Sequence, residues 1–399
     1  MPDSSTMPTE SDPARHPGST SSLRTANQRR VVDVLRGRSE DRPADGTPVT
    51  QAELARITGL APATVSNIVR DLSGAGLVAT EPGSGRRGTT IRIARAAGVV
   101  AGVDFGHSHL AVGIGDLAGN VIAERREPLD PGHTHDDGLG LARELLADLV
   151  AGAAVSEPVR SVGMGLPAPI VEGLVRSSAI LPGWVGVNAR EVSEAAFDLP
   201  VHIENDANLA ALAEHRQGAA RGHATSVLIK ISSGVGAGVI LENRLFRGSS
   251  GSAGEIGHLT LNEQGPVCRC GGRGCLEAYA SVGAVQELLA TQFPDASIDD
   301  IIAAAGEGNV SALRTFEDAG LHVGWGIASV VNLLNPDIVL IGGDMARAGD
   351  LLLDPVRIGL RRHALDTAAN TPVGAGVLGE RASLVGAVLL ASDRTELLD

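Results

Sequence analysis

The stretch SVLIKISSGVGAGVILENRLFRG, residues Ser226–Gly248, contains apolar extended runs separated by turns, and its first turn holds glycines at positions 234, 236 and 238. Apolar runs of this length between turn residues predict neighbouring β-strands in a meander. An earlier stretch, VVAGVDFGHSHLAVGIGDLAGNVIAERREPL at Val99–Leu129, has the same layout, with a glycine-rich turn at Gly106. The repetition predicts an internally duplicated body of two similar lobes, and a ligand cleft is expected between them.

The segments around these two stretches alternate between helical and extended patterns. A helical pattern covers about residues 137 to 154, VRSVGMGLPAPI (159–170) is strand-like, and PVHIENDANLAALAEHRQG (200–218) predicts a strand followed by a helix. HVGWGIASVVNLLNPDIVLIGGDM (322–345) predicts an apolar helix that ends before Pro336, and then a buried strand followed by two glycines. Alternating strands and helices predict an α/β body, and loops at such strand ends often face nucleotides.

Length and composition limit the class of protein. A chain of 399 residues is longer than one hydrophobic core usually holds, so two or three domains are expected. No run approaches the roughly 18 apolar residues that a membrane span needs. The first 22 residues are rich in Ser, Thr and Pro and lack the apolar stretch of a secretory signal. We therefore expect a disordered tail at 1–22, a cytoplasmic location and cysteines outside disulfides.

The net charge of −14 is distributed unevenly along the chain. Residues 23–95 hold 12 Arg and 7 Asp or Glu, a balance of +5. The first 22 residues carry −2, which leaves −17 for residues 96–399. A basic module ahead of an acidic body predicts a domain boundary near residue 95, and it makes residues 23–95 a candidate for nucleic-acid binding.

Residues 23–95 have the pattern of a helix-turn-helix. NQRRVVDVLRG predicts a first helix, and TQAELARITGL predicts a second one, with Thr50 and Glu53 as a capping box and Gly59 at its end. In PATVSNIVRDLSGAGLV, apolar residues at i, i+3, i+4 and i+7 predict a third helix with one buried face. This helix would enter the major groove of DNA. The residues that it would present are Thr64, Ser66, Asn67 and Arg70.

The stretch LVATEPGSGRRGTTIRIA predicts two extended segments around a loop that carries Arg86 and Arg87, as in a wing that contacts phosphates. The alternative is a small helical bundle used for protein contacts, since helix-turn-helix patterns arise in many helical sequences. The wing and the positive balance favour operator DNA. One short recognition helix reads few base pairs, which predicts a homodimer or homotetramer with a candidate contact at Leu321–Leu334.

All three cysteines lie in GHLTLNEQGPVCRCGGRGCLE, residues 257–277. His258, Cys268, Cys270 and Cys275 have the spacing H-x9-C-x-C-x4-C, and one imidazole with three thiolates makes the closed tetrahedral set that structural Zn²⁺ prefers. Four protein ligands leave no position for water, so the ion is expected to hold the loop and not to activate a nucleophile. The alternative is a redox-active or merely buried cysteine set.

Four segments, namely ENDANLAALAE, GSAGEIGHL, CRCGGRGCLEAY and NPDIVLIGG, resemble the ROK family of repressors, open reading frames and sugar kinases. With the N-terminal module, the resemblance covers nearly the whole chain after residue 22. It implies a two-lobed, actin-like ATPase fold and the four zinc ligands named above. In the family's kinases the position of Asp206 is the base that deprotonates the sugar hydroxyl attacking ATP. The resemblance implies sugar contacts at Asn205, Asp206, Glu255, His258 and Glu277.

The glycine loops that hold Mg-ATP in the family's kinases are altered in this chain. In the first loop, His107 and Ser108 replace a glycine and a threonine, and an imidazole there is expected to obstruct phosphate. Serines replace the first pair of the second loop, at 232 and 233, and Asp344 and Ala168 replace glycines elsewhere. The nucleotide positions that still match are Asp104, Gly106, Gly234, Gly236, Gly342 and Gly343.

Together these patterns predict a sugar-responsive transcriptional repressor, which binds a sugar or amino sugar without phosphorylating it efficiently. Sugar binding would change the closure of the lobes and thereby the geometry of the DNA-binding heads. The competing prediction is an ATP-dependent hexose kinase that carries an accessory DNA-binding head and uses Asp206 as its base.

Overall fold

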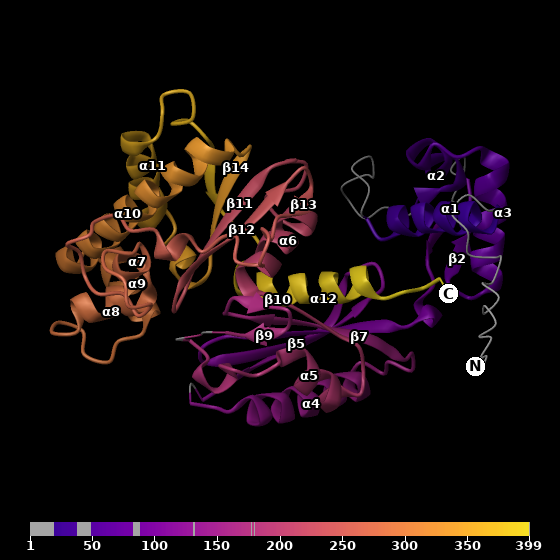
Figure 1. The fold of residues 1–399 in the computed structure, drawn as a ribbon, viewed down its shortest axis with the longest axis horizontal. Coiled ribbons are helices and arrows are strands. Elements are labelled where there is room, and N and C mark those ends of the chain that lie inside the picture. The colour runs from indigo at the N-terminus through magenta and orange to yellow at the C-terminus, as the bar shows by residue number, and fades with distance from the viewer. Residues whose placement is uncertain are drawn as a thin grey trace, which may run out of the picture. The chain divides into compact units, whose positions relative to one another are not determined.

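The structure, a computed structural model, describes residues 20–37, 49–82, 88–130, 132–176, 178 and 180–398. The chain divides into two compact units, one of Met1–Ala97 with Glu396–Asp399 and one of Gly98–Thr395 (Figure 1). Most of the predicted tail, residues 1–19, lies outside the described residues. The first helix begins at Thr20, earlier than the sequence pattern predicts.

The first unit combines three helices with a small antiparallel sheet of order β1-β3-β2. Thr50 and Glu53 form the predicted capping box, and Gly59 ends the same helix with φ 67°. The third helix buries its predicted apolar face, and β2 and β3 form the two sides of the wing. The elements are α1 (Thr20–Leu35), β1 (Val49–Thr50), α2 (Gln51–Thr58), α3 (Pro62–Gly74), β2 (Val78–Glu81) and β3 (Thr90–Ile93).

The second unit contains two five-stranded sheets built on one plan (Figure 1). The first has the order β10-β7-β4-β5-β6 and the second β13-β12-β11-β14-β15. In each sheet, two parallel strands extend an antiparallel meander beside its first strand, which confirms the predicted duplication. The first sheet consists of β4 (Val99–Phe105), β5 (His109–Asp116), β6 (Val121–Pro128), β7 (Val159–Leu166) and β10 (Val201–Asn205). The second consists of β11 (Ser226–Ile231), β12 (Val235–Leu241), β13 (Arg244–Leu245), β14 (Ile338–Gly342) and β15 (Val373–Ala375).

Each sheet has its own hydrophobic core, so we call the two halves of this unit the first lobe and the second lobe. Helix α12 (Ala382–Arg394) packs on the first sheet, α6 (Asp206–Gln217) packs on the second, and the two helices pack against each other. A short hairpin, β8 (Ile170–Val171) and β9 (Leu174–Val175), contacts β10. The remaining α-helices are α4 (His135–Gly152), α5 (Ala189–Phe197), α7 (Glu277–Ala280), α8 (Val282–Leu289), α9 (Ile298–Gly306), α10 (Val310–Leu334) and α11 (Asp350–His363).

The predicted oligomer contact at Leu321–Leu334 forms the C-terminal part of α10, and its apolar side chains are largely used inside the chain. Helix α10 packs along α11, and Val323, Ile327 and Val331 are fully buried. Leu333 is the exception, with 82% of its surface exposed. Internal packing therefore explains why this helix is apolar on more than one face. In the described ranges, no helix is long and apolar enough to cross a membrane.

Candidate functional site: a metal loop and a cleft between the lobes

The four predicted metal ligands come together in one loop of the second lobe. The candidate ligand atoms of His258, Cys268, Cys270 and Cys275 all lie within 4.8 Å of one another. Cys268 Sγ is 3.9 Å from His258 Nδ1, and Cys270 Sγ is 3.8 Å from Cys275 Sγ. Tetrahedral zinc with Zn–S bonds of about 2.3 Å places two sulfur atoms about 3.8 Å apart. The donor set and its spacing therefore fit Zn²⁺.

The metal loop is held by backbone pairing and by a glycine that no other residue can replace. Isolated bridges pair Thr260 with Cys275 and Val267 with Arg273. Gly274 has φ 64°, and a Cβ atom there would lie 1.6 Å from the carbonyl oxygen of Asn262. This close approach brings Cys275 back towards Cys268 and Cys270.

The thiols of this loop differ in how readily they lose a proton. Burial raises the pKa of Cys268, and burial together with its cysteine neighbours raises the pKa of Cys275 to about 12. The backbone N–H of Gly272 lowers the pKa of Cys270. A bound cation would offset the cost of holding three thiolates so close together, which is a further reason that the set suits a metal.

His258 connects the metal loop to the predicted sugar residues. Its Nδ1 faces Cys268, while its Nε2 lies 3.9 Å from Glu255 Oε2. One imidazole can thus bind a metal through one nitrogen and face a ligand through the other. Burial raises the pKa of Glu255, opposed by His258 and assisted by the carboxylates of Asp206 and Glu277. Glu255 is therefore the residue around which the other predicted sugar carboxylates gather.

Glu277 and Asn205 have structural partners besides any ligand. Glu277 is buried, accepts a hydrogen bond from the Val235 N–H at 3.1 Å, and lies 3.4 Å from Arg269 Nη2. Asn205 caps α6, because its side-chain oxygen accepts from the N–H groups of Ala207 and Asn208. Its amide nitrogen donates to the Ala168 carbonyl oxygen at 3.4 Å.

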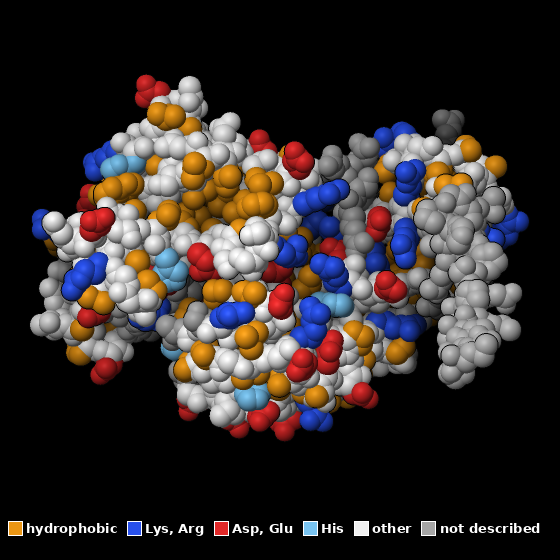
Figure 2. Space-filling model, viewed as in Figure 1, with side chains coloured by type: hydrophobic (Ala, Val, Ile, Leu, Met, Phe, Trp, Pro, Cys, Tyr) orange, Lys and Arg blue, Asp and Glu red, His pale blue; other side chains and the backbone are white. Residues whose placement is uncertain are grey.

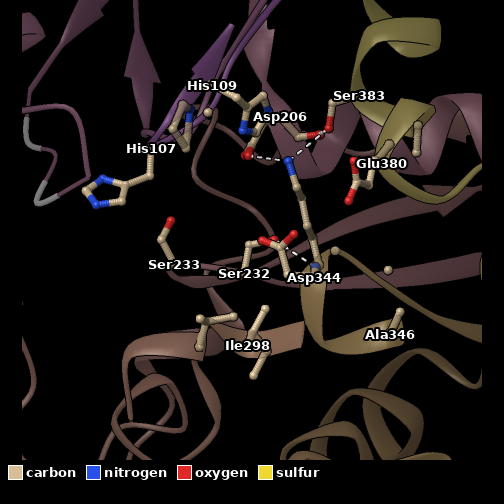
Figure 3. A pocket seen from close by; sticks show the side chains of 18 of the residues that line it. His107, His109, Asp206, Ser232, Ser233, Ile298, Asp344, Ala346, Glu380 and Ser383 are labelled. Carbon is tan, nitrogen blue, oxygen red and sulfur yellow. Dashed lines mark hydrogen bonds and ion pairs between the residues drawn. The ribbon is translucent and has the colours of Figure 1, made fainter. Parts of the chain in front are cut away.

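The side chain that sequence reasoning missed is Lys230, the only lysine of the chain. Its Nζ lies 2.6 Å from Asp206 Oδ2 and donates to Ser383 Oγ at 2.9 Å (Figure 3). Burial by itself would lower the pKa of Lys230, but the carboxylates of Asp206 and Asp104 outweigh it and the pKa is raised. Lys230 therefore stays charged and joins β11 to the start of α6 and to α12.

The predicted nucleotide loops line a cleft of about 460 Å³ that both lobes contribute to. Asp104 is buried, and His109 Nε2 lies 3.7 Å from its Oδ2. Burial raises the pKa of Asp104, but the His109 hydrogen bond and the charge of Lys230 outweigh it and the pKa is lowered. A Cβ atom at Gly106 would meet the His109 ring at 2.0 Å, so this imidazole covers the first loop.

The second and third loops are bonded to each other. The backbone N–H of Asp344 donates to Ser232 Oγ at 3.1 Å (Figure 3). Asp344 also pairs with Arg347 at 3.3 Å. His107 Nδ1 is 3.2 Å from the Ile180 carbonyl oxygen. Ser232 Oγ, the Asp344 N–H and His107 Nδ1 therefore already have partners in the protein.

Two of the matching glycines are required by internal packing. A Cβ atom at Gly234 would lie 2.8 Å from Glu277 Oε2, and one at Gly343, where φ is 79°, would lie 2.5 Å from the Ile231 carbonyl oxygen. Gly236 and Gly342 have ordinary contact distances of 3.4 Å and 3.5 Å. The glycines at 234 and 343 would therefore be needed even in a protein that binds no nucleotide.

On the first unit, the predicted DNA-contacting residues of α3 are not all equally available. Asn67 and Arg70 are exposed and hydrogen-bonded to each other, and Thr64 is half-buried. Ser66 donates to Gln51 Oε1 at 2.9 Å and is thus engaged with α2. Arg86 and Arg87 lie outside the described residues.

Comparison with known proteins agrees with this geometry. The ROK family model matches residues 100–394, and the MarR family model matches residues 28–88. The xylose repressor of Bacillus spizizenii is 30% identical over 320 residues, covering 78% of this chain and 82% of the repressor. The glucokinase of Streptomyces coelicolor is 31% identical over 319 residues, covering 74% of this chain and 98% of the kinase.

Among solved structures, a ROK family transcriptional regulator described as a homolog of the E. coli MLC protein is 26% identical, with a TM-score of 0.77. The match covers 92% of this chain and 96% of the regulator. A ROK family glucokinase from Streptomyces griseus in complex with glucose and AMPPNP is 30% identical, with a TM-score of 0.65, and covers 74% of this chain and 100% of the kinase. The chain belongs to the ROK family and carries a MarR-type winged helix-turn-helix ahead of its ROK body.

Proposed function

We propose that this protein is a sugar-responsive repressor whose ROK body binds a sugar or amino sugar without phosphorylating it efficiently. The observation that carries the proposal is the 2.6 Å contact between Lys230 Nζ and Asp206 Oδ2. A general base must direct a free lone pair at the hydroxyl that it deprotonates. An ammonium group on this carboxylate competes for that role and leaves Asp206 as a hydrogen-bond acceptor for a bound sugar.

The sugar site of the proposal is the group Asn205, Asp206, Glu255, His258 and Glu277. Carboxylates and an imidazole are suitable partners for sugar hydroxyls, because each can accept a hydrogen bond. A Zn²⁺ ion held by the Cys₃His set would fix His258 and, through the loop, Glu277. The metal ion would thus organise the site without contacting the sugar.

The DNA-binding part of the proposal uses Asn67 and Arg70, with Thr64 and Ser66 as less exposed neighbours and Arg86 and Arg87 as wing residues. Two heads on an inverted repeat would require a homodimer or a homotetramer. The names of the xylose repressors and of the MLC homolog support a regulator that acts on operator DNA. Action on chromosomal DNA would place the protein in the cytoplasm. Residues 1–22 would form a tail, 23–95 the DNA-binding domain and 96–399 the sugar-binding body.

The regulatory proposal is tested with DNA selected by this protein from a random pool. Fluorescence anisotropy then measures the affinity for that DNA with and without each member of a panel of hexoses, pentoses and amino sugars. A sugar that couples to DNA by about 1–3 kcal/mol changes the affinity by roughly 5- to 150-fold. Arg70→Ala should weaken DNA binding, while Arg29→Ala, an exposed arginine of α1, serves as the matched control. Unchanged DNA affinity with every sugar would contradict the proposal.

The second candidate is an ATP-dependent hexose kinase, and the 31% identity to the Streptomyces coelicolor glucokinase favours testing it. ADP release from Mg-ATP is measured with the same sugar panel for the wild type and for Asp206→Asn. We expect no sugar-dependent ADP release from either protein. Sugar-dependent turnover that disappears in Asp206→Asn would show that the protein is a kinase.

A further inference from the structure

A second pocket lies at the edge of the first sheet, away from the nucleotide loops. Its volume is about 480 Å³, within the range of small-molecule sites. Strand β10, helix α5, the β8–β9 turn and the end of α12 contribute from the first lobe, and the segment after β13 contributes from the second. Figure 2 shows blue side chains gathered over β13, β10 and the end of α12. The charged and titratable residues that line it are Glu172, Arg190, His202, Glu204, Arg247 and Arg394.

The three arginines of this pocket are not equivalent. Arg247 Nε lies 2.5 Å from Glu204 Oε2, and the other oxygen of that carboxylate accepts from Asn205 and Asn208. This pair is satisfied within the protein. Within the described ranges, the guanidinium groups of Arg190 and Arg394 have neither an ion-pair nor a hydrogen-bond partner, although both line the pocket. Two unpaired guanidinium groups lining one pocket are unexpected in a body whose net charge is −17.

His202 adds an unsatisfied polar atom between these cations. Its Nε2 is buried and has no hydrogen-bond partner among the described residues. Burial lowers the pKa of His202, and the charges of Arg394 and Arg190 lower it further, against the opposing effect of Glu194. All three residues line the same pocket.

We propose that this pocket binds a small oxyanion of the phosphate type, free or as the phosphate group of a metabolite. Arg190 and Arg394 would each donate through the planar fork that suits such oxygens, with His202 lining the pocket beside them. The satisfied Arg247–Glu204 pair would form the wall on the side of the second lobe. The pocket shares Asn205 with the proposed sugar site, but its arginines belong to no site described above.

A ligand in this pocket would lie next to the strand end that carries the proposed sugar residues. Asn205 lines the pocket and directly precedes Asp206, so the occupied site would act on the strand end that positions the sugar residues. An oxyanion would therefore modulate sugar binding, and this consequence rests on the proposed function.

Calorimetric titration of the full chain with inorganic phosphate, sulfate, glucose 6-phosphate, glucose and acetate at low ionic strength tests the proposal. We expect phosphate, sulfate and the sugar phosphate to bind, and at least tenfold weaker binding by the double variant Arg190→Gln/Arg394→Gln. Arg361→Gln, which changes an exposed arginine of α11, is the matched control and should bind as the wild type does. Tighter binding of glucose 6-phosphate than of phosphate would identify a phosphorylated metabolite as the ligand, and equal binding would identify the free anion.

Binding that is equal in the wild type and in the double variant would overturn the proposal, as would binding of acetate in preference to phosphate. A second measurement does not need the variant to fold. Phenylglyoxal modification followed by peptide mass spectrometry should show Arg190 and Arg394 protected by phosphate at least fivefold, and Arg361 unprotected. If phosphate leaves all three arginines modified at equal rates, the proposal is rejected.

Discussion

The sugar side and the nucleotide side of the cleft carry the same kinds of groups, but those groups have different partners. On the sugar side, Glu255 and His258 face each other at 3.9 Å, which is longer than a hydrogen bond. Asp206, a predicted sugar residue, is paired with Lys230 at 2.6 Å, and on the nucleotide side the second loop is bonded to the third through Ser232. Glu255 and His258 thus make no direct hydrogen bond to each other, whereas the second and third nucleotide loops are bonded together.

This difference teaches how the proposed lack of phosphorylation is compatible with an intact fold. A buried carboxylate such as Asp206 needs a counter-charge, and Lys230 supplies one without any ligand. Glycines of the nucleotide loops are also constrained by internal packing, as at Gly234 and Gly343. Retained loop glycines are therefore weak evidence for nucleotide binding, whereas the partners of the loop's polar atoms are stronger evidence.

The largest effect is expected from Lys230→Met, which removes the cation from the nucleotide side. Asp206, with 12% of its side chain exposed, would lose its ion-pair partner, and breaking such a pair costs about 3–5 kcal/mol. Urea unfolding followed by tryptophan fluorescence reports on this unit alone, because Trp184 and Trp325 are the only tryptophans. The double variant Lys230→Met/Asp206→Asn should recover most of the loss. A double variant as unstable as Lys230→Met would mean that the charge of Asp206 is not what Lys230 balances.

The second-largest effect is expected when a metal ligand is removed, because the metal loop carries predicted sugar residues. Cys275→Ser should reduce the metal content from one ion per chain to none, measured by elemental analysis. The affinity for the effector sugar should fall by about 100-fold, which corresponds to the loss of about two hydrogen bonds from His258 and Glu277. Gln264→Ala, an exposed change in the same loop, is the control. Sugar affinity that survives removal of the metal would show that the loop is organised without it.

A smaller effect is expected from the altered loops on the nucleotide side. Ser232→Gly with Asp344→Gly restores two family glycines and removes the bond between the loops. Mg-AMPPNP affinity, measured by calorimetry, should rise at least tenfold, because the backbone can then approach the phosphates and one carboxylate is removed. Adding Lys230→Thr should lower the affinity again, because it removes the cation that balances Asp104 and Asp206 beside an anionic ligand. An affinity that the two glycines leave unchanged would show that these substitutions do not exclude the nucleotide.

The fold and the metal set could be predicted from the sequence because their signals are local. The two meanders span Val99–Pro128 and Ser226–Leu245, the capping box of α2 spans Thr50 to Glu53, and the four metal ligands lie within one loop. Each of these features depends on spacing along the chain, which periodicity and turn residues reveal. What covers the C-terminal half of α10 could not be predicted from local signals, because an apolar helix gives the same pattern whether α11 or a second subunit covers it.

The functional residue that spacing could not reveal is Lys230, whose partners are 24 and 153 residues away along the chain. The available signal was a single lysine in the apolar strand that leads into a glycine loop. A charged residue in a buried strand needs a partner, and Asp206 was already a candidate carboxylate. The pocket formed by Arg190, His202 and Arg394 is equally non-local, because α5, β10 and α12 meet only in the folded protein.

The smallest expected effect is the pH dependence of the stability that Lys230 provides. The pKa of Lys230 is raised above its ordinary value of 10.5, since Asp206 and Asp104 outweigh the effect of burial. The stabilisation that this lysine provides is therefore complete below pH 10.5 and is lost as the pH rises towards the pKa in the folded state, by at most about 1.4 kcal/mol per pH unit. The difference in unfolding free energy between the wild type and Lys230→Met should thus narrow between pH 10 and 11.5. The other titrating groups are the same in both proteins, so a constant difference across this range would mean that the pKa of Lys230 is not raised in the folded state.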